Sequence, residues 1–315
     1  MTALTLLEAS KLMQGEDIRQ AVVEIFAQSH PLLAVMPFEP ISGNAISFNR
    51  EGTLPTTAFR AVNAAYTANS GVLEPVTEKL FIAGGDIDVD RFIVKTMGEG
   101  QRTNHESMKL KALSHSWAYK FIKGDNQTTV TEFDGMQARC LGDQLVPATN
   151  AGTPTNGGDL IYLSQLDAAI DAVVGPTHLL MSRATKRAFS AAFRGTTVAS
   201  NIQQTRDDFG RPILTYNGLP IITMDDPDQQ TASIAADEAD YNGTVATCTS
   251  IYVVALGDNK LTGIQNGAPD VEDLGELQTA PVYRTRMEWY AGICQWSKRP
   301  FARYYSIKSG ATVAA

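Results

Sequence analysis

At 315 residues and 34.0 kDa, the chain is long enough to bury one large core or two smaller ones. Its 43% hydrophobic content and mean hydropathy of -0.13 exclude an intrinsically disordered protein, and no apolar run approaches the ~20 residues of a membrane-spanning helix. The sequence pI of about 5.1 argues against a module that reads duplex nucleic acid, which would carry a basic face or a pI above ~9. Three widely spaced cysteines, Cys140, Cys248 and Cys294, fit no zinc or redox motif and predict small buried side chains in a reducing compartment.

The net charge of -8 is concentrated in one region. Residues 225–273 contain ten acids and a single base, Lys260, so this segment carries -9 and the rest of the chain about +1. The segment 284–308 is basic instead. Opposite fields on one chain favour association between copies, although solvated surface charge is the commoner explanation.

The first predicted element is an amphipathic helix over 16–28, which ends before Pro31. Its apolar face carries Ile18, Val22, Ile25 and Phe26. No basic region precedes an apolar block at the N-terminus, so the sequence shows no secretory signal.

Two extended runs, from Ile41 and over 72–82, together predict a long β-hairpin. Between them, residues 50–70 are rich in Gly, Thr, Ala, Pro and Asn, with Phe59 and Tyr66 as the only large apolar anchors. A loop this long without a core of its own is usually functional or an interaction arm. We therefore predict that this segment binds another subunit.

Strand character continues over 80–96. Three carboxylates alternate along this run: Asp86, Asp88 and Asp90. They resemble the start of a calcium loop, but the glycine required at the sixth position is Arg91 and the twelfth position is Met97. The alternation instead predicts a solvated strand edge.

The residues from Thr103 to Glu106 fit a capping box that opens a helix over 104–123, about 30 Å long. One stripe of this helix is apolar: Leu110, Leu113, Trp117 and Phe121. Residues 125–158 then form a Gly-, Thr-, Asn- and Pro-rich connector, the best internal boundary of the chain.

The second half alternates helical and extended patterns. A helix, a strand, a helix and a strand are predicted over 160–173, 178–181, 183–193 and 251–256. Within 211–224, Asn217 and Gly218 are typical of a type I′ hairpin turn. Strands rich in Tyr, Trp and Phe close the chain over 282–307.

The sequence contains no convincing active site. His178 and Ser182 lack a G-x-S-x-G elbow, and His105 and His115 are too far apart to chelate from adjacent turns. Neither a Walker loop nor G-x-G-x-x-G occurs. The closing aromatics favour core and intersubunit packing over base or sugar stacking. We predict no catalytic, cofactor-binding or metal-binding residue.

Several short stretches are similar to those of one known family. They are Phe121-Ile-Lys-Gly-Asp, Phe133-Asp-Gly-Met, Ser250-Ile-Tyr-Val-Val-Ala-Leu-Gly, Gly263-Ile-Gln-Asn-Gly and Asp273-Leu-Gly-Glu. With these stretches, the order of elements resembles the major capsid proteins of tailed bacteriophages, the Hong Kong 97-type fold, over nearly the whole chain.

The resemblance implies an α+β fold in five parts. These are an N-arm (1–40), an extended β-hairpin loop (41–82), a peripheral domain (83–157) with a spine helix (104–123), an axial α/β domain (158–275), and closing strands of the peripheral domain (276–315). Some members crosslink through Lys and Asn side chains, and we predict no such crosslink here.

The resemblance implies a coat protein of the virion, assembled in the host cytoplasm, whose hexamers and pentamers form an icosahedral head around double-stranded DNA. It implies portal and possibly decoration proteins as partners. Because Met1 lies almost directly on the N-arm, we expect a separate scaffolding protein or assembly without one. We predict arm-tip contacts between subunits at Arg50, Glu51, Phe59, Arg60 and Tyr66. The acidic segment 225–273 would keep DNA from adhering to the shell.

Three alternatives remain at this point. An encapsulin-like compartment would hold protein cargo in the same fold. A hydrolase would use His178. A tail-tube or adaptor protein would form tubes or rings.

Overall fold

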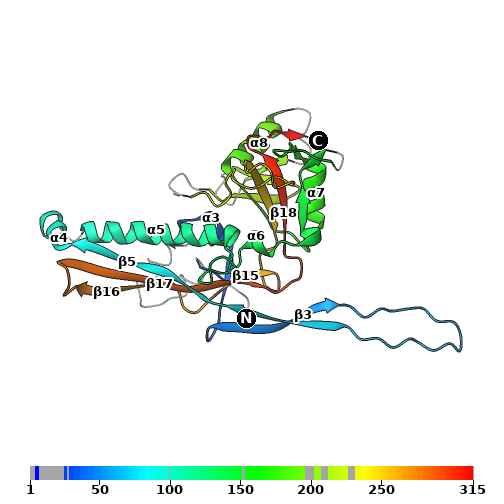
Figure 1. Cartoon of the computed structure of the whole chain (residues 1–315), viewed down its shortest axis with the longest axis horizontal. Coiled ribbons are helices and arrows are strands. Elements are labelled where there is room, and N and C mark those ends of the chain that lie inside the picture. The colour runs from blue at the N-terminus through cyan, green and yellow to red at the C-terminus, as the bar shows by residue number, and fades with distance from the viewer. Residues whose placement is uncertain are drawn as a thin grey trace.

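The computed structural model describes residues 4–6, 25–26, 28–98, 100–150, 153–195, 202–206, 212–225 and 231–314. They form two bodies built on separate β-sheets, and a long two-stranded arm that leaves the lower body (Figure 1). The predicted α+β class is confirmed. Most of the helix predicted over 16–28 lies outside the described residues. Within that range, the structure describes Ile25, Phe26 and Gln28, and all three are helical.

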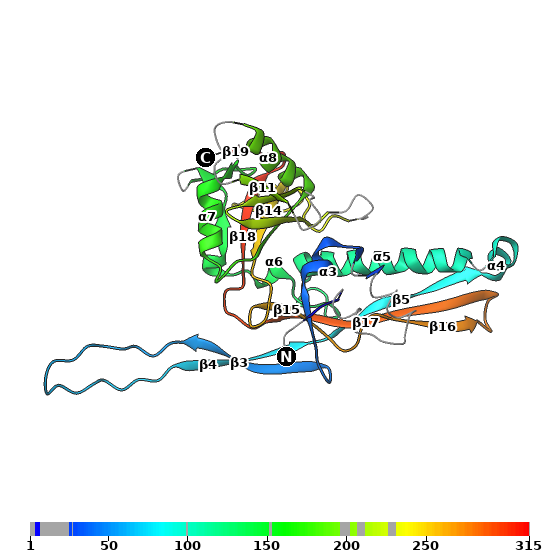
Figure 2. The ribbon, with the colours of Figure 1, turned by 180° about the vertical axis from the view of Figure 1, so that it is seen from behind.

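The lower body is a six-stranded sheet covered on one face by a long helix (Figures 1 and 2). Its central strand, β17 (Val282–Gln295), pairs with β5, β15 and β16, and β2 and β1 extend the sheet beyond β15. These strands are β1 (Leu4–Thr5), β2 (Pro37–Pro40), β5 (Phe81–Asp90), β15 (Leu261–Gln265) and β16 (Asp270–Glu276). Helix α5 (Gly100–Lys123) spans about 36 Å over β5 and β17, with α4 (Arg91–Met97) at its start.

The upper body is a seven-stranded mixed sheet in the order β11-β12-β13-β10-β14-β18-β6. Its strands are β6 (Leu145–Pro147), β10 (His178–Met181), β11 (Ile202–Arg206), β12 (Pro212–Tyr216), β13 (Leu219–Thr223), β14 (Cys248–Val254) and β18 (Phe301–Lys308). Helices α7 (Leu163–Asp171) and α8 (Arg183–Arg194) pack against this sheet.

Short elements complete the chain. They are α3 (Pro31–Val35), α6 (Met136–Arg139), the 3-10 helix η1 (Gly142–Gln144), the pair β7 (Thr149–Asn150) and β8 (Thr153–Pro154), and the pair β9 (Ile161–Tyr162) and β19 (Val313–Ala314). The arm consists of β3 (Ala45–Thr53) and β4 (Val72–Lys79).

Strand β14 separates two hydrophobic cores. Its side chains alternate between faces, so Ile251 and Val253 join the core under α7 and α8, whereas Tyr252 and Val254 join the core that contains α5. All seven residues of β14 are buried. A strand buried on both faces has a continuous apolar run, which is the pattern that predicted it.

Several predicted elements are confirmed at nearly the predicted bounds. Strand β10 and helix α8 match the predicted 178–181 and 183–193. At the predicted hairpin turn, Asn217 and Gly218 have φ angles of 49° and 80°, as a type I′ turn requires.

The prediction of strand over 80–96 is wrong beyond Asp90. The Asp90 side chain accepts a hydrogen bond from the backbone N of Phe92 at 2.7 Å and thereby caps α4. The start of the long helix is also corrected. It begins at Gly100, four residues before the predicted bound, and Thr103 lies inside it. Glu106 does not reach back to a cap: its carboxylate accepts from Thr285 Oγ1 on β17 at 2.7 Å.

The two sheets divide the chain differently from the expected ranges. Strands β15 and β16, within 158–275, belong to the lower sheet. Strands β6 and β18, within 83–157 and 276–315, belong to the upper sheet. Neither sheet therefore comes from one continuous segment, and the chain crosses from one to the other repeatedly.

Candidate functional site

The arm projects from the lower body at the end opposite α4 (Figures 1 and 2). Its strands pair antiparallel from Ala45 opposite Lys79 to Thr53 opposite Val72. Beyond the last pair, residues 54–71 form an extended loop that we call the arm tip. The predicted hairpin with an unpaired tip is confirmed.

The arm tip exposes apolar side chains that no other described residue covers. They are Leu54, Phe59, Val62 and Tyr66, each at least 68% exposed. The Arg60 guanidinium lies 5.0 Å from the centre of the Tyr66 ring and donates to the Ala64 carbonyl at 3.1 Å. Contiguous exposed apolar surface marks an interaction site in soluble proteins.

Four of the five predicted contact residues lie on exposed surface of the arm: Glu51, Phe59, Arg60 and Tyr66. The fifth, Arg50, is half-buried and donates to the Glu74 carboxylate across the hairpin at 3.3 Å. Arg50 thus joins the two strands of the arm. Contacts of all five with a second subunit remain a prediction.

A cluster of contacts that we call the root fixes the base of the arm to the body. The Phe48 ring lies 4.4 Å from the Trp296 ring, and Lys298 donates to the Gly52 carbonyl at 3.1 Å. On the other strand, Arg139 binds both oxygens of Glu78, at 2.5 and 2.9 Å. Sequence reasoning missed the root because its partners are 61 to 248 residues apart.

Exposed apolar side chains also gather at the opposite end of the lower body. Helix α4 and the first turns of α5 carry Phe92, Ile93, Met97 and Met108. The molecule therefore has exposed apolar groups at both ends of its long axis (Figure 1).

The three alternating aspartates of β5 have roles within the chain. Asp86 binds Arg286 at 2.8 Å and Asp88 binds Arg284 at 2.6 Å, both on the neighbouring strand β17. These hydrogen bonds hold the pKa of both carboxyls below their usual value. The ladder lies on a solvated face of the sheet, as its alternation predicts.

The acidic segment 225–273 does not form one uniform surface. Asp237 pairs with Lys123 at 2.6 Å, Glu238 with Arg303 at 2.9 Å, and Asp273 with Arg102. Asp240 accepts from the backbone of Gly157 and Thr244, and Asp225 from the backbone of Arg183 and Ile234. Much of this charge is thus neutralised or bound inside the subunit.

The histidines have structural surroundings. His178 Nδ1 lies 3.0 Å from Thr177 Oγ1, and burial lowers the pKa of His178. Ser182 Oγ accepts from the backbone N of Thr185 and caps α8. His115 is buried on α5, and its ring lies 6.0 Å from that of His30. No three metal-ligating side chains cluster in the described ranges.

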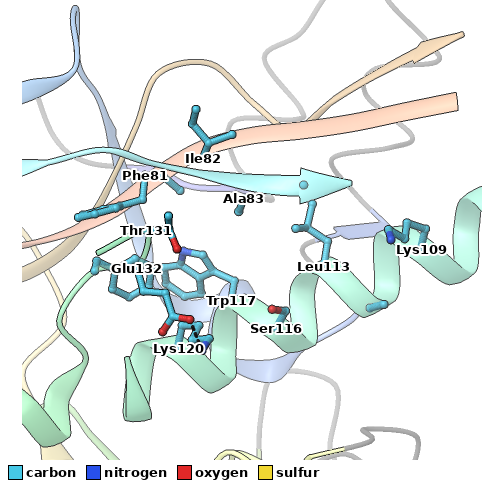
Figure 3. A pocket seen from close by; sticks show the side chains of 14 residues that line it. Phe81, Ile82, Ala83, Lys109, Leu113, Ser116, Trp117, Lys120, Thr131 and Glu132 are labelled. Carbon is cyan, nitrogen blue, oxygen red and sulfur yellow. Dashed lines mark ion pairs between the residues drawn. The ribbon is translucent and has the colours of Figure 1, made fainter. Parts of the chain in front are cut away.

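A groove of about 420 Å³ runs between α5 and β5 (Figure 3). Its wall includes Phe81, Leu113, Trp117 and Phe133, and a Lys120–Glu132 ion pair of 2.5 Å lies at its rim. The buried Trp117 Nε1 has no hydrogen-bond partner among the described residues. Across the described part of the chain, no helix has the length and apolar character to cross a membrane.

Structural comparison shows a shared fold over about nine tenths of the chain. An encapsulin complex, holo-SrpI from Synechococcus elongatus, has a TM-score of 0.62 at 15% identity, covering 90% of this chain and 89% of that one. The capsid of a native GTA particle has 0.57 at 14% (89% and 90%). Mycobacterium phage Bobi has 0.58 at 12% (90% and 90%). Identities this low show the fold alone.

The sequence itself gives a second line of evidence. The family model of major capsid protein GP7 matches residues 14–158, which include the arm and α5. A search of curated protein sequences found no match. Over residues 14–158 the chain is thus similar to a family of major capsid proteins, and over about nine tenths of its length it shares the Hong Kong 97-type fold with phage capsid chains.

Proposed function

We propose that copies of this chain form hexamers and pentamers, and that these close into an icosahedral head shell around double-stranded DNA. The observation that carries the proposal is the arm: an exposed apolar tip held away from its own subunit by a built root. A two-stranded hairpin is at best marginally stable alone. Laid over a neighbouring subunit, the tip buries this apolar surface and joins the two copies.

The proposal includes self-association as the dominant interaction. Closed symmetry repeats each contact many times, so modest interfaces suffice for a stable shell. Scaffolding, portal and decoration proteins are further proposed partners, with assembly in the host cytoplasm. DNA would be enclosed without sequence reading, in keeping with the pI of about 5.1.

Excision of the arm tip tests the proposal. Since Thr53 and Val72 are the last paired residues, Asn-Gly can replace 54–71 and close the hairpin with a two-residue turn. We expect a folded subunit with unchanged circular dichroism that no longer forms closed particles by negative-stain microscopy, alone or with its scaffold. A variant with Asn242→Ser on the exposed 241–244 turn is the control. Normal shells from the excised chain would contradict the proposed role of the arm.

A second candidate is a shell that holds protein cargo, supported by the shared fold with an encapsulin. The contents of purified particles distinguish the two. Nuclease-protected DNA supports the phage head. Particles free of nucleic acid that retain a co-expressed enzyme support the compartment.

A further inference from the structure

We infer that the root couples the direction of the arm to the junction between the two sheets, with Arg139, Trp296 and Lys298 as its positioning residues. The inference rests on the proposed role of the arm in assembly and adds what sets its direction.

After the arm, the chain passes between the two sheets three times. It leaves α6 for β6 through 140–144, leaves β14 for β15 through 255–260, and leaves β17 for β18 through 296–300. We call these three connections the crossovers. Any change in the angle between the sheets must be absorbed there, because the crossovers are the covalent links between the two bodies in this part of the chain.

The crossovers are bonded to one another. Trp296 N donates to the Lys260 carbonyl at 2.9 Å, which joins the second and third. Arg299 pairs with Asp143 at 2.8 Å, which joins the first and third. The buried Gln144 Nε2 of the first crossover donates to the carbonyl of Phe301, the first residue of β18 after the third crossover, at 2.7 Å. The three connections therefore form one hydrogen-bonded junction.

The arm binds this junction through both of its strands. On β3, Phe48 packs on Trp296 and Gly52 accepts from Lys298, both residues of the third crossover. On β4, Glu78 binds Arg139, the residue at the end of α6 where the first crossover begins.

The Arg139 contact is held firmly in place. Its Nε donates to the Asp134 carbonyl at 2.7 Å while its two terminal nitrogens hold Glu78, and both side chains are at most 15% exposed. A planar guanidinium bound at three points fixes direction as well as distance. The direction of β4 is thus fixed by the Arg139 guanidinium, which is itself held next to the junction.

The consequence is that the arm and the upper body move together. Rotating one sheet relative to the other displaces the crossovers, and the arm follows because both its strands are bound to them. Subunits in rings of six and of five could then present the arm at different angles without any change in the arm itself.

Hydrogen exchange on the unassembled subunit tests the coupling separately from assembly. The key variant is Gln144→Ala, which removes the hydrogen bond from the first crossover to Phe301, where the third crossover enters β18; this bond involves no arm residue. We expect amides of β3 and β4 near the root to exchange about three- to tenfold faster, the order expected from losing one buried hydrogen bond. Arg139→Gln, which removes the bidentate contact with Glu78 on β4, should increase the exchange rate of these amides at least as much.

Tyr216→Phe is the matched control. It also removes a side-chain hydrogen bond of the upper sheet, the 2.7 Å bond from Tyr216 to Asp167. Tyr216 lies on β12, which three strands separate from β18, the strand that follows the third crossover. Arm exchange should not change in this variant. Unchanged arm exchange in Gln144→Ala, or an equal increase in Tyr216→Phe, would overturn the inference. If the tip-excised chain still formed closed particles, this would instead count against the proposed function, whatever the exchange data show.

Discussion

The arm and the lower body both carry large aromatic side chains, but the lower body buries them and the arm exposes them. In the lower body, Trp289 packs within 5.6 Å of three rings, those of Phe26, Phe38 and Trp117, and is 1% exposed. On the arm, Phe59 is fully exposed. The body has a second layer, helix α5, to cover its sheet, whereas no described residue forms a second layer over the arm tip. Burial depends on whether the chain supplies the covering layer.

The largest expected effect comes from removing one aromatic side chain from each region. Trp289→Ala should lower the free energy of unfolding by about 3–5 kcal/mol, because it leaves a cavity among packed rings. Phe59→Ala should leave subunit stability unchanged within about 0.5 kcal/mol and reduce particle yield instead. Urea denaturation and particle counts by microscopy measure the two effects. If Phe59→Ala destabilised the isolated subunit, the tip would have to pack on its own chain.

Ion pairs offer a second contrast. Glu238 is 2% exposed and bound to Arg303, so Arg303→Met leaves a buried charge uncompensated and should cost about 3–5 kcal/mol. Arg50→Met on the arm removes a partly exposed pair with Glu74 and should cost about 0–1 kcal/mol. Chemical denaturation of both variants measures the two losses in free energy of unfolding. Replacing Glu238 and Arg303 together with apolar residues should recover most of the loss.

Turn residues give a smaller difference. Gly218 has a φ of 80°, so Gly218→Ala should cost about 1 kcal/mol in the upper body. Asn63 at the arm tip has a φ of 65°, yet Asn63→Ala should not shift the unfolding midpoint, because the tip contributes little to the subunit's cooperative unfolding. Thermal melts compare the two. A clear loss for Asn63→Ala would show that the tip unfolds with the body.

The smallest expected effect concerns the pH dependence of stability at Asp240, in the acidic segment. Hydrogen bonds from the backbone of Gly157, Val245 and Thr244 hold the pKa of Asp240 at about 2, below its ordinary 3.8. The folded state thus favours the ionised form, and this stabilisation is present above about pH 4 and lost as pH falls toward 2. The melting temperature of Asp240→Asn should therefore lie below wild type at pH 6, with the gap closing by pH 2. A constant gap would exclude ionisation as its cause.

Local patterns in the sequence predicted the parts of the fold that local chemistry decides. The Asn217-Gly218 turn, strand β10 and the unpaired arm tip follow from backbone preference and periodicity. The segment 91–97 was mispredicted, because the alternation of aspartates outweighed the capping signal of Asp90. Glu106 was assigned to a cap because the sequence does not show that Thr285 lies beside it.

The candidate site shows the same division. Exposure of Phe59 and Tyr66 could be predicted, because the surrounding residues supply no core. The root could not, because Arg139 and Glu78 are brought together only when α6 packs at the base of the hairpin. The exposed residues of the arm tip could be predicted from the sequence. The root residues that fix the direction of the arm could be identified only from the fold.

The pairing of β5 with β17 also governs the order of events during synthesis. The two strands meet from Phe81 opposite Ala291 to Asp90 opposite Val282, so β5 must wait for about 200 residues of chain to be translated before its partner exists. At ~5–20 residues per second, that delay is about 10–40 seconds. Throughout it, the arm and an unpaired strand are exposed together, and such species aggregate readily. A nascent subunit is therefore most vulnerable just before β17 emerges, and its yield in cells should depend on protection during that interval.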